Sequence, residues 1–299
     1  MKCHSYSCVT GKRVFETAVL IKTPKDEIPD KGFKECCYLN YVFADSNSND
    51  DYKNDYHGFF HQKQANNETC DFILRNVDTN TDYALNNSTY GEFKAFGSIT
   101  SNVKLTQFIL SWKKVLTLLG EGSFQIIKSI NVSGLSYEVK SNTYILKKFS
   151  NFIADKTIRI DITQDGKLVK LGIDFKNSGF KTTLRTVGFF GHKEREYTQD
   201  NLVFSNNEKE EQISSIVENK YKLQINKVPE CITNDLFDFI LFGNEIFVND
   251  YNIVNHSYYE KQPVRLDSNS GTEYFKYSRN AQINLIFIDR YKLERKINY

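Results

Sequence analysis

The chain has 299 residues, enough for one large domain or two of ordinary size. Its 39 basic and 37 acidic side chains leave a formal net charge of +2, which gives no reason to expect a specific nucleic-acid partner. Aromatic side chains suit pleated sheets, and 23 Phe and 18 Tyr are available to build a core. Only four prolines are present, which excludes long Pro-rich stalks.

Neither a targeting segment nor a membrane span is expected. The residues after Met1 lack an apolar core of signal-peptide length, and no apolar run approaches the roughly 18 residues that would cross a bilayer. The cysteines are few for the length and two are adjacent, so a disulfide scaffold is not expected. We predict reduced thiols, made in a cytoplasm, at Cys3, Cys8, Cys36, Cys37, Cys70 and Cys231.

Short strand-like runs separated by polar turns are expected through the first hundred residues. Pro24, Pro29 and Gly32 mark an early loop. Residues 45–56, DSNSNDDYKNDY, are the most polar stretch and are predicted to form an exposed, mobile loop. From Gly58 onward, runs such as CDFILRNV alternate with Asn-rich turns, which is typical of β structure.

Two segments have helix signals. In residues 103–119, apolar side chains recur at i, i+4, i+7 and i+11, and Gly120 stands where a glycine would end a helix. Because the run could equally begin as a strand, we predict a helix over about Ser111–Leu119. A second helix is predicted over Thr233–Phe242, with a capping residue at its start and Gly243 after its end.

The clearest hairpin signal lies in Lys156–Gly191. Isoleucines alternate with polar residues over its first strand, as in a strand with one buried face. Asp165-Gly166 is a strong tight-turn signal because Gly accepts a positive φ, so we expect the chain to return through Leu168–Phe175.

A second turn at Asn177-Ser178-Gly179 would lead into a strand over Thr182–Phe190. The four runs are too close together for crossover helices and therefore predict an antiparallel meander. Further on, the polar run at 205–212 is predicted to be a hairpin loop, and 213–228 a strand pair or an edge strand.

These signals predict a mainly β fold with two antiparallel β-sandwich or barrel-like domains and one or two short helices. A junction is expected near Lys140–Phe152. We therefore place an N-terminal β-rich domain at residues 1–145 and a C-terminal β-rich domain at residues 146–299.

Three groupings have some features of metal sites but lack others. The loop at 45–56 has Asp50 where a calcium loop needs Gly and Tyr56 where it needs Glu. His57 and His61 would share one face of a helix, but Gly58 makes a helix improbable there. The third grouping lacks the spacing of zinc ligands and comprises Cys3, His4, Cys8, Cys36 and Cys37. We predict no metal and no cofactor.

No catalytic signature is present, and the chain is not expected to be an enzyme. His192 and His256 have no nucleophile in a recognisable turn nearby. Carboxylate pairs could serve a glycosidase, but among 37 acids such pairs arise freely. Examples are Asp238 with Glu245 and Asp161 with Asp165. The GEGSF run at 120–124 lacks the Lys and Ser/Thr of a phosphate loop.

The C-terminal region is rich in tyrosine: Tyr251, Tyr258, Tyr259, Tyr274 and Tyr277. Exposed rings can stack on sugars or anchor protein interfaces, while the plainer interpretation is packing within a sheet. We predict that these five tyrosines contribute to an interface. The polar loops at 45–56 and 205–212 are predicted to become ordered only against a neighbouring molecule.

Several segments resemble the tail ring proteins of crAss-like podoviruses, which are phages of Bacteroidetes hosts. In the C-terminal half they are ADKTIRIDITQDGKL (154–168), LRTVGFFG (184–191), GNEIFVNDYNIVNH (243–256) and FKYSRNAQINLIFIDR (275–290). In the N-terminal half they are STYGEFKAFG (88–97) and WKKVLTLLGEGSF (112–124). The resemblance implies a β-rich virion protein that forms homo-oligomeric rings in a viral tail and is assembled in the host cytoplasm. It transfers no active-site residue.

The first hypothesis is therefore a structural virion protein, acting through interfaces with copies of itself and with other phage tail proteins. Ring assembly would bury edge strands and aromatic patches that a monomer must protect in other ways. A carbohydrate- or receptor-binding β-module is the alternative, with the tyrosines as its platform. A tail-associated glycan hydrolase that uses a carboxylate pair is the second alternative.

Overall fold

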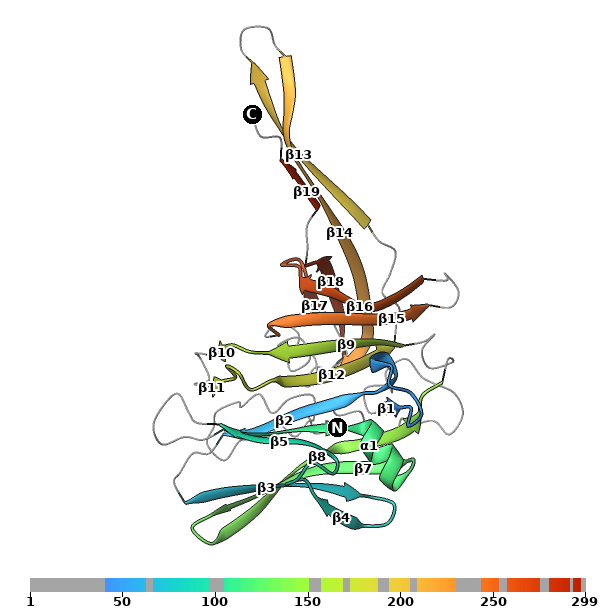
Figure 1. Cartoon of the computed structure of the whole chain (residues 1–299), viewed down its shortest axis with the longest axis vertical. Helices are drawn as coiled ribbons and strands as arrows, with labels where there is room; N and C mark the ends of the chain where they lie inside the picture. Colours follow the sequence, from blue (N-terminus) through green and yellow to red (C-terminus); the bar gives the residue numbers. More distant parts are fainter. Residues whose placement is uncertain are drawn as a thin grey trace.

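The computed structural model describes residues 41–62, 67–96, 105–150, 157–168, 173–187, 194–204, 209–229, 243–252, 257–274, 280–290 and 293–296. Within these ranges the chain is mainly β, with one α-helix and sheets that are almost entirely antiparallel (Figure 1). The predicted fold class is confirmed. No helix in the described ranges is long and apolar enough to cross a membrane.

Two sheets form a β-sandwich in the N-terminal half. The five-stranded sheet has the order β1 (Tyr41–Ala44), β8 (Leu135–Lys148), β7 (Gly122–Val132), β3 (Glu68–Asn76), β4 (Thr81–Ala84). The three-stranded sheet has the order β2 (Tyr56–Gln62), β6 (Leu105–Ser111), β5 (Gly91–Phe96). All pairs are antiparallel except β1 with β8, which is parallel.

Helix α1 (Trp112–Leu119) follows β6 directly, as the apolar periodicity predicts. The Ser111 side chain accepts a hydrogen bond from the backbone N–H of Lys114, which satisfies one donor of the first turn. At the other end Gly120 has φ +81°, a conformation that favours glycine. Both the helix and the strand that leads into it are therefore present.

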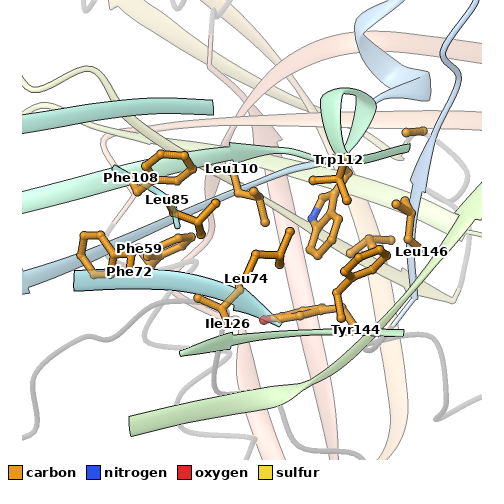
Figure 2. Packing of buried hydrophobic residues seen from close by; sticks show 14 residues of the cluster. Phe59, Phe72, Leu74, Leu85, Phe108, Leu110, Trp112, Ile126, Tyr144 and Leu146 are labelled. Carbon is orange, nitrogen blue, oxygen red and sulfur yellow. The ribbon is translucent and has the colours of Figure 1, made fainter. Parts of the chain in front are cut away.

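The core of the sandwich lies between the two sheets and beneath α1 (Figure 2). Phe59 from β2 meets Phe72 from β3 at 5.0 Å between ring centroids, in an edge-on contact across the sandwich. Trp112 from α1 and Tyr144 from β8 are packed at 5.5 Å. Such aromatic pairs fill the gap between sheets that Ala or Val would leave open.

A nine-stranded sheet dominates the C-terminal half (Figure 1). Its main path is β12 (Phe180–Val187), β9 (Thr157–Gln164), β15 (Glu245–Asn252), β16 (Ser257–Leu266), β18 (Asn280–Asp289), β14 (Lys209–Pro229), β13 (Glu194–Phe204). Two further strands branch from it: β17 (Gly271–Tyr274) pairs with β18, and β19 (Leu293–Lys296) pairs with β14. Whether the two halves are separate domains, with a boundary at 145/146, stays a prediction.

The predicted meander in Lys156–Gly191 is wrong in its pairing, although the described part of this segment contains four strands. Strand β9 pairs with β12, and between them the short strands β10 (Lys167–Leu168) and β11 (Ile173–Asp174) pair with each other. The described strands are thus nested, with the pair β10–β11 inside the pair β9–β12. The cross-strand match of β9 with β12 outweighs the local turn signal.

Asp165-Gly166 consequently lies between β9 and β10, on one side of the β9–β12 hairpin, and does not form the turn of a hairpin. Gly166 does not have a positive φ, contrary to the prediction. The Asp165 carboxylate accepts a 2.6 Å hydrogen bond from the Asn177 N–H across the hairpin. The predicted turn at 177–179 is confirmed, with φ +60° at Asn177 and +63° at Gly179.

Strand β9 also departs from the half-buried pattern that its alternation predicts. Its isoleucines are buried as expected, but Thr157, Arg159 and Asp161 on the polar face are buried too. The polar face is covered by the segment that precedes β2, which supplies partners for these side chains.

Other predictions have mixed outcomes. Strands β13 and β14 pair up to Phe204 opposite Lys209, so the predicted hairpin connection is confirmed, although 209–212 belong to the strand itself. Residues 213–228 lie within a single strand, β14, and not in a strand pair. It pairs with β13 up to Lys220, with β18 from Lys220 onward, and with β19 over Ser214–Val217. The second predicted helix, Thr233–Phe242, lies outside the described residues.

The two halves meet where β12 packs on β2, and Gly58 of β2 makes this approach possible. A β carbon at Gly58 would lie 2.2 Å from the Lys181 carbonyl oxygen and 3.0 Å from two ring carbons of Phe180. Beside it, the Thr183 hydroxyl accepts from the Tyr56 N–H and donates to the Tyr56 carbonyl. One side chain thus replaces two bonds of a backbone ladder.

Replacing Gly58 with Ala is expected to lower the free energy of unfolding by roughly 1–3 kcal/mol, because the methyl group must displace the backbone of β12. Urea unfolding of the variant and the parent would measure the change. Gly271→Ala is the matched control, since its β carbon would meet nothing within 4 Å. Equal unfolding midpoints for the two variants would contradict the close approach.

Candidate functional site

The structure brings four of the five predicted interface tyrosines into one sheet. Tyr251 on β15 is directly opposite Tyr258 on β16, and Tyr259 is opposite Asp250. Tyr274 ends β17, where it is opposite Ala281 on β18. Tyr277 lies outside the described residues. The role of these tyrosines in an interface stays a prediction.

The polar loop at 45–56 has partners within the chain, so the prediction that it orders only against a neighbour is wrong. The Lys113 ammonium of α1 donates to the Ser48 carbonyl at 2.7 Å and to the Asn49 side chain at 2.8 Å. The Asn54 amide donates to the carbonyls of Ser48 and Asp50. These bonds tie the loop to α1 and to itself.

Both histidines of the HGFFH run lie on strand β2, and neither lies among other metal ligands. Trp112 Nε1 donates to His57 Nδ1 at 2.7 Å, and the His57 ring is buried. His61 is buried beside Glu68, with 2.7 Å between Nε2 and Oε1. In the described ranges, no three His, Cys, Asp or Glu side chains gather as metal ligands would.

The remaining chemical candidates do not form a described site. The carboxylate of Asp161 is buried beside Arg159 while Asp165 is exposed, so the pair does not face a common substrate position. Cys70 lies on β3 opposite Ile130 of β7 and is partly buried. Several candidates lie outside the described residues: Cys3, His4, Cys8, Cys36, Cys37, His192, Cys231, Asp238 and His256.

A buried ionic cluster joins the two halves of the chain, and its centre is the pair Asp55–Arg185. Arg185 on β12 donates to Asp55 through Nη2 at 2.7 Å and through Nε at 3.0 Å. The same carboxylate accepts from the Phe43 N–H at 2.9 Å. Burial alone would raise the pKa of Asp55, but the charge and hydrogen bonds of Arg185 hold it below its ordinary value.

Arg159 extends this cluster toward β9. Its Nε donates to Asp161 at 2.6 Å and lies 3.8 Å from Asp55, and its Nη1 donates to the Asp51 carbonyl. The guanidinium also lies over the Tyr56 ring, 5.2 Å from the centroid. With Asp51, the cluster holds three carboxylates and two guanidinium groups. Burial accordingly raises the pKa of Asp161 despite the neighbouring Arg159.

Sequence reasoning missed this cluster because its members are far apart in the chain. Arg159 and Asp161 occupy the alternate positions of β9 that a half-buried strand would turn to solvent. Asp55 lies in a polar run that is typical of an exposed loop. A weak signal was nevertheless available: oppositely charged residues at i and i+2 lie on one face of a strand and can pair there.

The most exposed feature of the described chain is the ribbon formed by β13 and β14, which we call the arm. It projects from the body along the long axis of the molecule (Figure 1). All eight residues of Glu194–Asn201 are exposed, including Tyr197 with 58% of its surface accessible. At its base the arm continues into buried Tyr221 and Leu223 of β14, so it is anchored in the sheet.

The arm is held straight by polar contacts and not by a core. On one face Gln212 donates to the Tyr197 hydroxyl at 2.9 Å, and Tyr197 donates to Gln199. On the other face the acids pair with lysines of β14, as in Lys220 with Glu196 at 2.7 Å. Strand β13 pairs with β14, and no other described strand covers its second edge.

Comparisons with known proteins give no family assignment: no family model matches the chain, and no curated protein matches it.

Replacing Asp55 with Asn is expected to lower the free energy of unfolding by roughly 3–5 kcal/mol, because two buried guanidinium groups lose their shared carboxylate. Asp82→Asn is the control, since Asp82 pairs with Arg75 at 2.6 and 2.7 Å on the surface. Solvent screens that pair, so its loss should matter much less. Chemical denaturation would compare the two, and equal losses would show that the cluster does not hold the halves together.

The stability of the fold is expected to depend on pH through His57. Burial lowers the pKa of His57 to about 4, from an ordinary value of 6.5. Between these values the unfolded chain binds the extra proton, so stability falls as the pH falls from 6.5 toward 4, by roughly 3 kcal/mol in all. His57→Gln removes the titrating group, and its unfolding free energy should fall less steeply over this range. Parallel pH curves for the two proteins would contradict the assignment.

Proposed function

We propose that the chain is a structural virion protein, a subunit of a homo-oligomeric ring in a phage tail that acts through protein–protein interfaces. The single observation that supports this most directly is the arm, a long ribbon with both faces of β13 exposed. Strand β19 adds a third strand only beside Ser214–Val217 of β14, and a two-stranded ribbon is only marginally stable in water. Ordering its residues costs free energy that burial must offset, and the arm buries little within its own chain. A neighbouring subunit would supply the missing burial.

A ring also fits the asymmetry of the chain. Ring interfaces are heterologous, with one surface of each subunit meeting a different surface of the next. The arm lies at one end of the molecule and the five-stranded sheet lies toward the other (Figure 1). The place in a phage tail, beside other tail proteins, is supported by the resemblance of several segments to the tail ring proteins of crAss-like podoviruses.

Light scattering combined with negative-stain imaging tests the proposal, on the purified protein alone and with its tail partners. We expect closed ring-shaped oligomers. Tyr197→Ser should weaken assembly by about tenfold, because an exposed aromatic side chain can anchor an interface. Leu135→Ser is the matched control, as Leu135 is 74% exposed but lies outside the arm. A protein that stays monomeric in every context, purified virions included, would overturn the proposal. A carbohydrate-binding module would then be the leading hypothesis.

A further inference from the structure

We propose that β13 of one subunit pairs edge to edge with β5 of a second copy of this chain, so that the arm extends the neighbour's three-stranded sheet. This inference rests on the proposed ring and names the two surfaces that would meet in it. It follows from three properties of the described strands: open edges, exposure on both faces, and complementary charges.

Strands β13 and β5 share an unusual environment. Each pairs with one neighbour, β13 with β14 and β5 with β6, so each has an edge that no described strand covers, called open below. Each is also exposed on both faces: three consecutive residues of β5, Glu92–Lys94, are exposed, and Phe93 is 41% accessible. An open edge has unpaired N–H and C=O groups that another strand can bond.

Pairing of β13 with its own copy is disfavoured by its charges. In a two-fold antiparallel pair of identical strands, residues on one face meet residues of the same face. The even-numbered face of β13 contains Glu194, Glu196 and Asp200 and no basic residue. Acid would therefore lie opposite or diagonal to acid, and like charges directly opposite each other are destabilising. Lys222 and Lys220 of β14 pair with Glu194 and Glu196 and reduce this repulsion, but they belong to the neighbouring strand and not to the new contact. The arm should select a different strand.

Strand β5 matches β13 in one antiparallel register. With Phe93 opposite Tyr197, two exposed rings form a cross-strand pair. The next positions then bring Lys94 opposite Glu196 and Glu92 opposite Thr198. A parallel arrangement about the same ring pair would instead oppose Glu92 to Glu196. Opposite charges and aromatic pairs both stabilise neighbouring strands, so the antiparallel register is favoured.

The two short edge strands of the five-stranded sheet, β1 and β4, match β13 less well, and three of the four residues of β1 are buried. Strand β4 has the sequence Thr-Asp-Tyr-Ala and no basic residue to meet the acids of β13. Its Asp82 is already paired with Arg75. In contrast, the Lys94 side chain is 43% exposed, lies 3.8 Å from Glu92 and donates to the Ser178 carbonyl at 3.4 Å. Both contacts are long, and neither is a close ion pair with a carboxylate. Since β5 and β13 belong to different surfaces of one chain, their contact is heterologous and generates a ring when it closes.

Cysteine cross-linking between two variants tests the contact. The background replaces the six native cysteines with Ser, and one protein then has Phe93→Cys while the other has Tyr197→Cys. Directly opposite residues of antiparallel strands lie about 4.5–5.5 Å apart between Cα atoms, within reach of a disulfide. Mixing the two under mild oxidation should give a linked dimer at least about tenfold above either variant alone.

Two outcomes would overturn the inference. Cross-linking of the Tyr197→Cys variant with itself would show that arms pair with arms. Rings on the microscope grid without a linked dimer in the mixture would leave the proposed ring intact but remove this contact. Absence of rings altogether would instead count against the proposed function, so the two failures are distinguishable.

A charge exchange in the native sequence provides a second test, which holds even if the cysteine-free background does not fold. Lys94→Glu should weaken assembly by about five- to tenfold, because it would bring two acids together. Adding Glu196→Lys should restore assembly, since the pair is then reversed. The single changes affect exposed side chains and should leave the melting temperature of the subunit nearly unchanged. A double variant that assembles no better than Lys94→Glu would contradict the predicted register.

Discussion

The buried ion pair between Asp55 and Arg185 is the constraint on which the arrangement of the two halves depends. A carboxylate and a guanidinium removed from water are tolerable when both are fully hydrogen-bonded, and leaving either without its partner is costly. Asp55 follows β1 in the N-terminal sandwich, and Arg185 lies on β12 of the nine-stranded sheet. A shift of one half against the other would break the pair, so the cluster fixes their relative position.

The direction of the arm follows from this constraint. Strand β12, which holds Arg185, and strand β13, which forms the arm, are the two ends of one continuous sheet. A sheet of hydrogen-bonded strands transmits the position of one end to the other, because each ladder fixes the register of the next. The ionic cluster thus sets where the arm points relative to the edge of β5. Rigid placement of this kind suits a subunit that must repeat the same contact around a ring.

How much the sequence predicts depends on how local each interaction is. The periodicity of 103–119 predicts α1 because its apolar face, its capping serine and Gly120 all lie within a few residues. Asp165-Gly166 misleads for the complementary reason: its turn preference is local, but the pairing of β9 with β12 is decided by residues about twenty positions apart. The ionic cluster joins Asp55 to Arg185 across 130 positions, and nothing in a single sequence indicates that they meet. Exposure of the arm is likewise a property of the tertiary arrangement, although its hairpin is predictable.

The open edge of β13 shows how a strand can remain available without pairing at random. Natural sheets protect their edges with charge, bulges or covering segments. Strand β12 is protected by a covering segment, since β2 packs against it and the Thr183 hydroxyl bonds the Tyr56 backbone. Strand β13 is protected by charge: its acids disfavour pairing with a second β13 while leaving the backbone groups of the edge accessible. A charge pattern that excludes the identical strand but accepts one with a lysine in register provides specificity as well as protection.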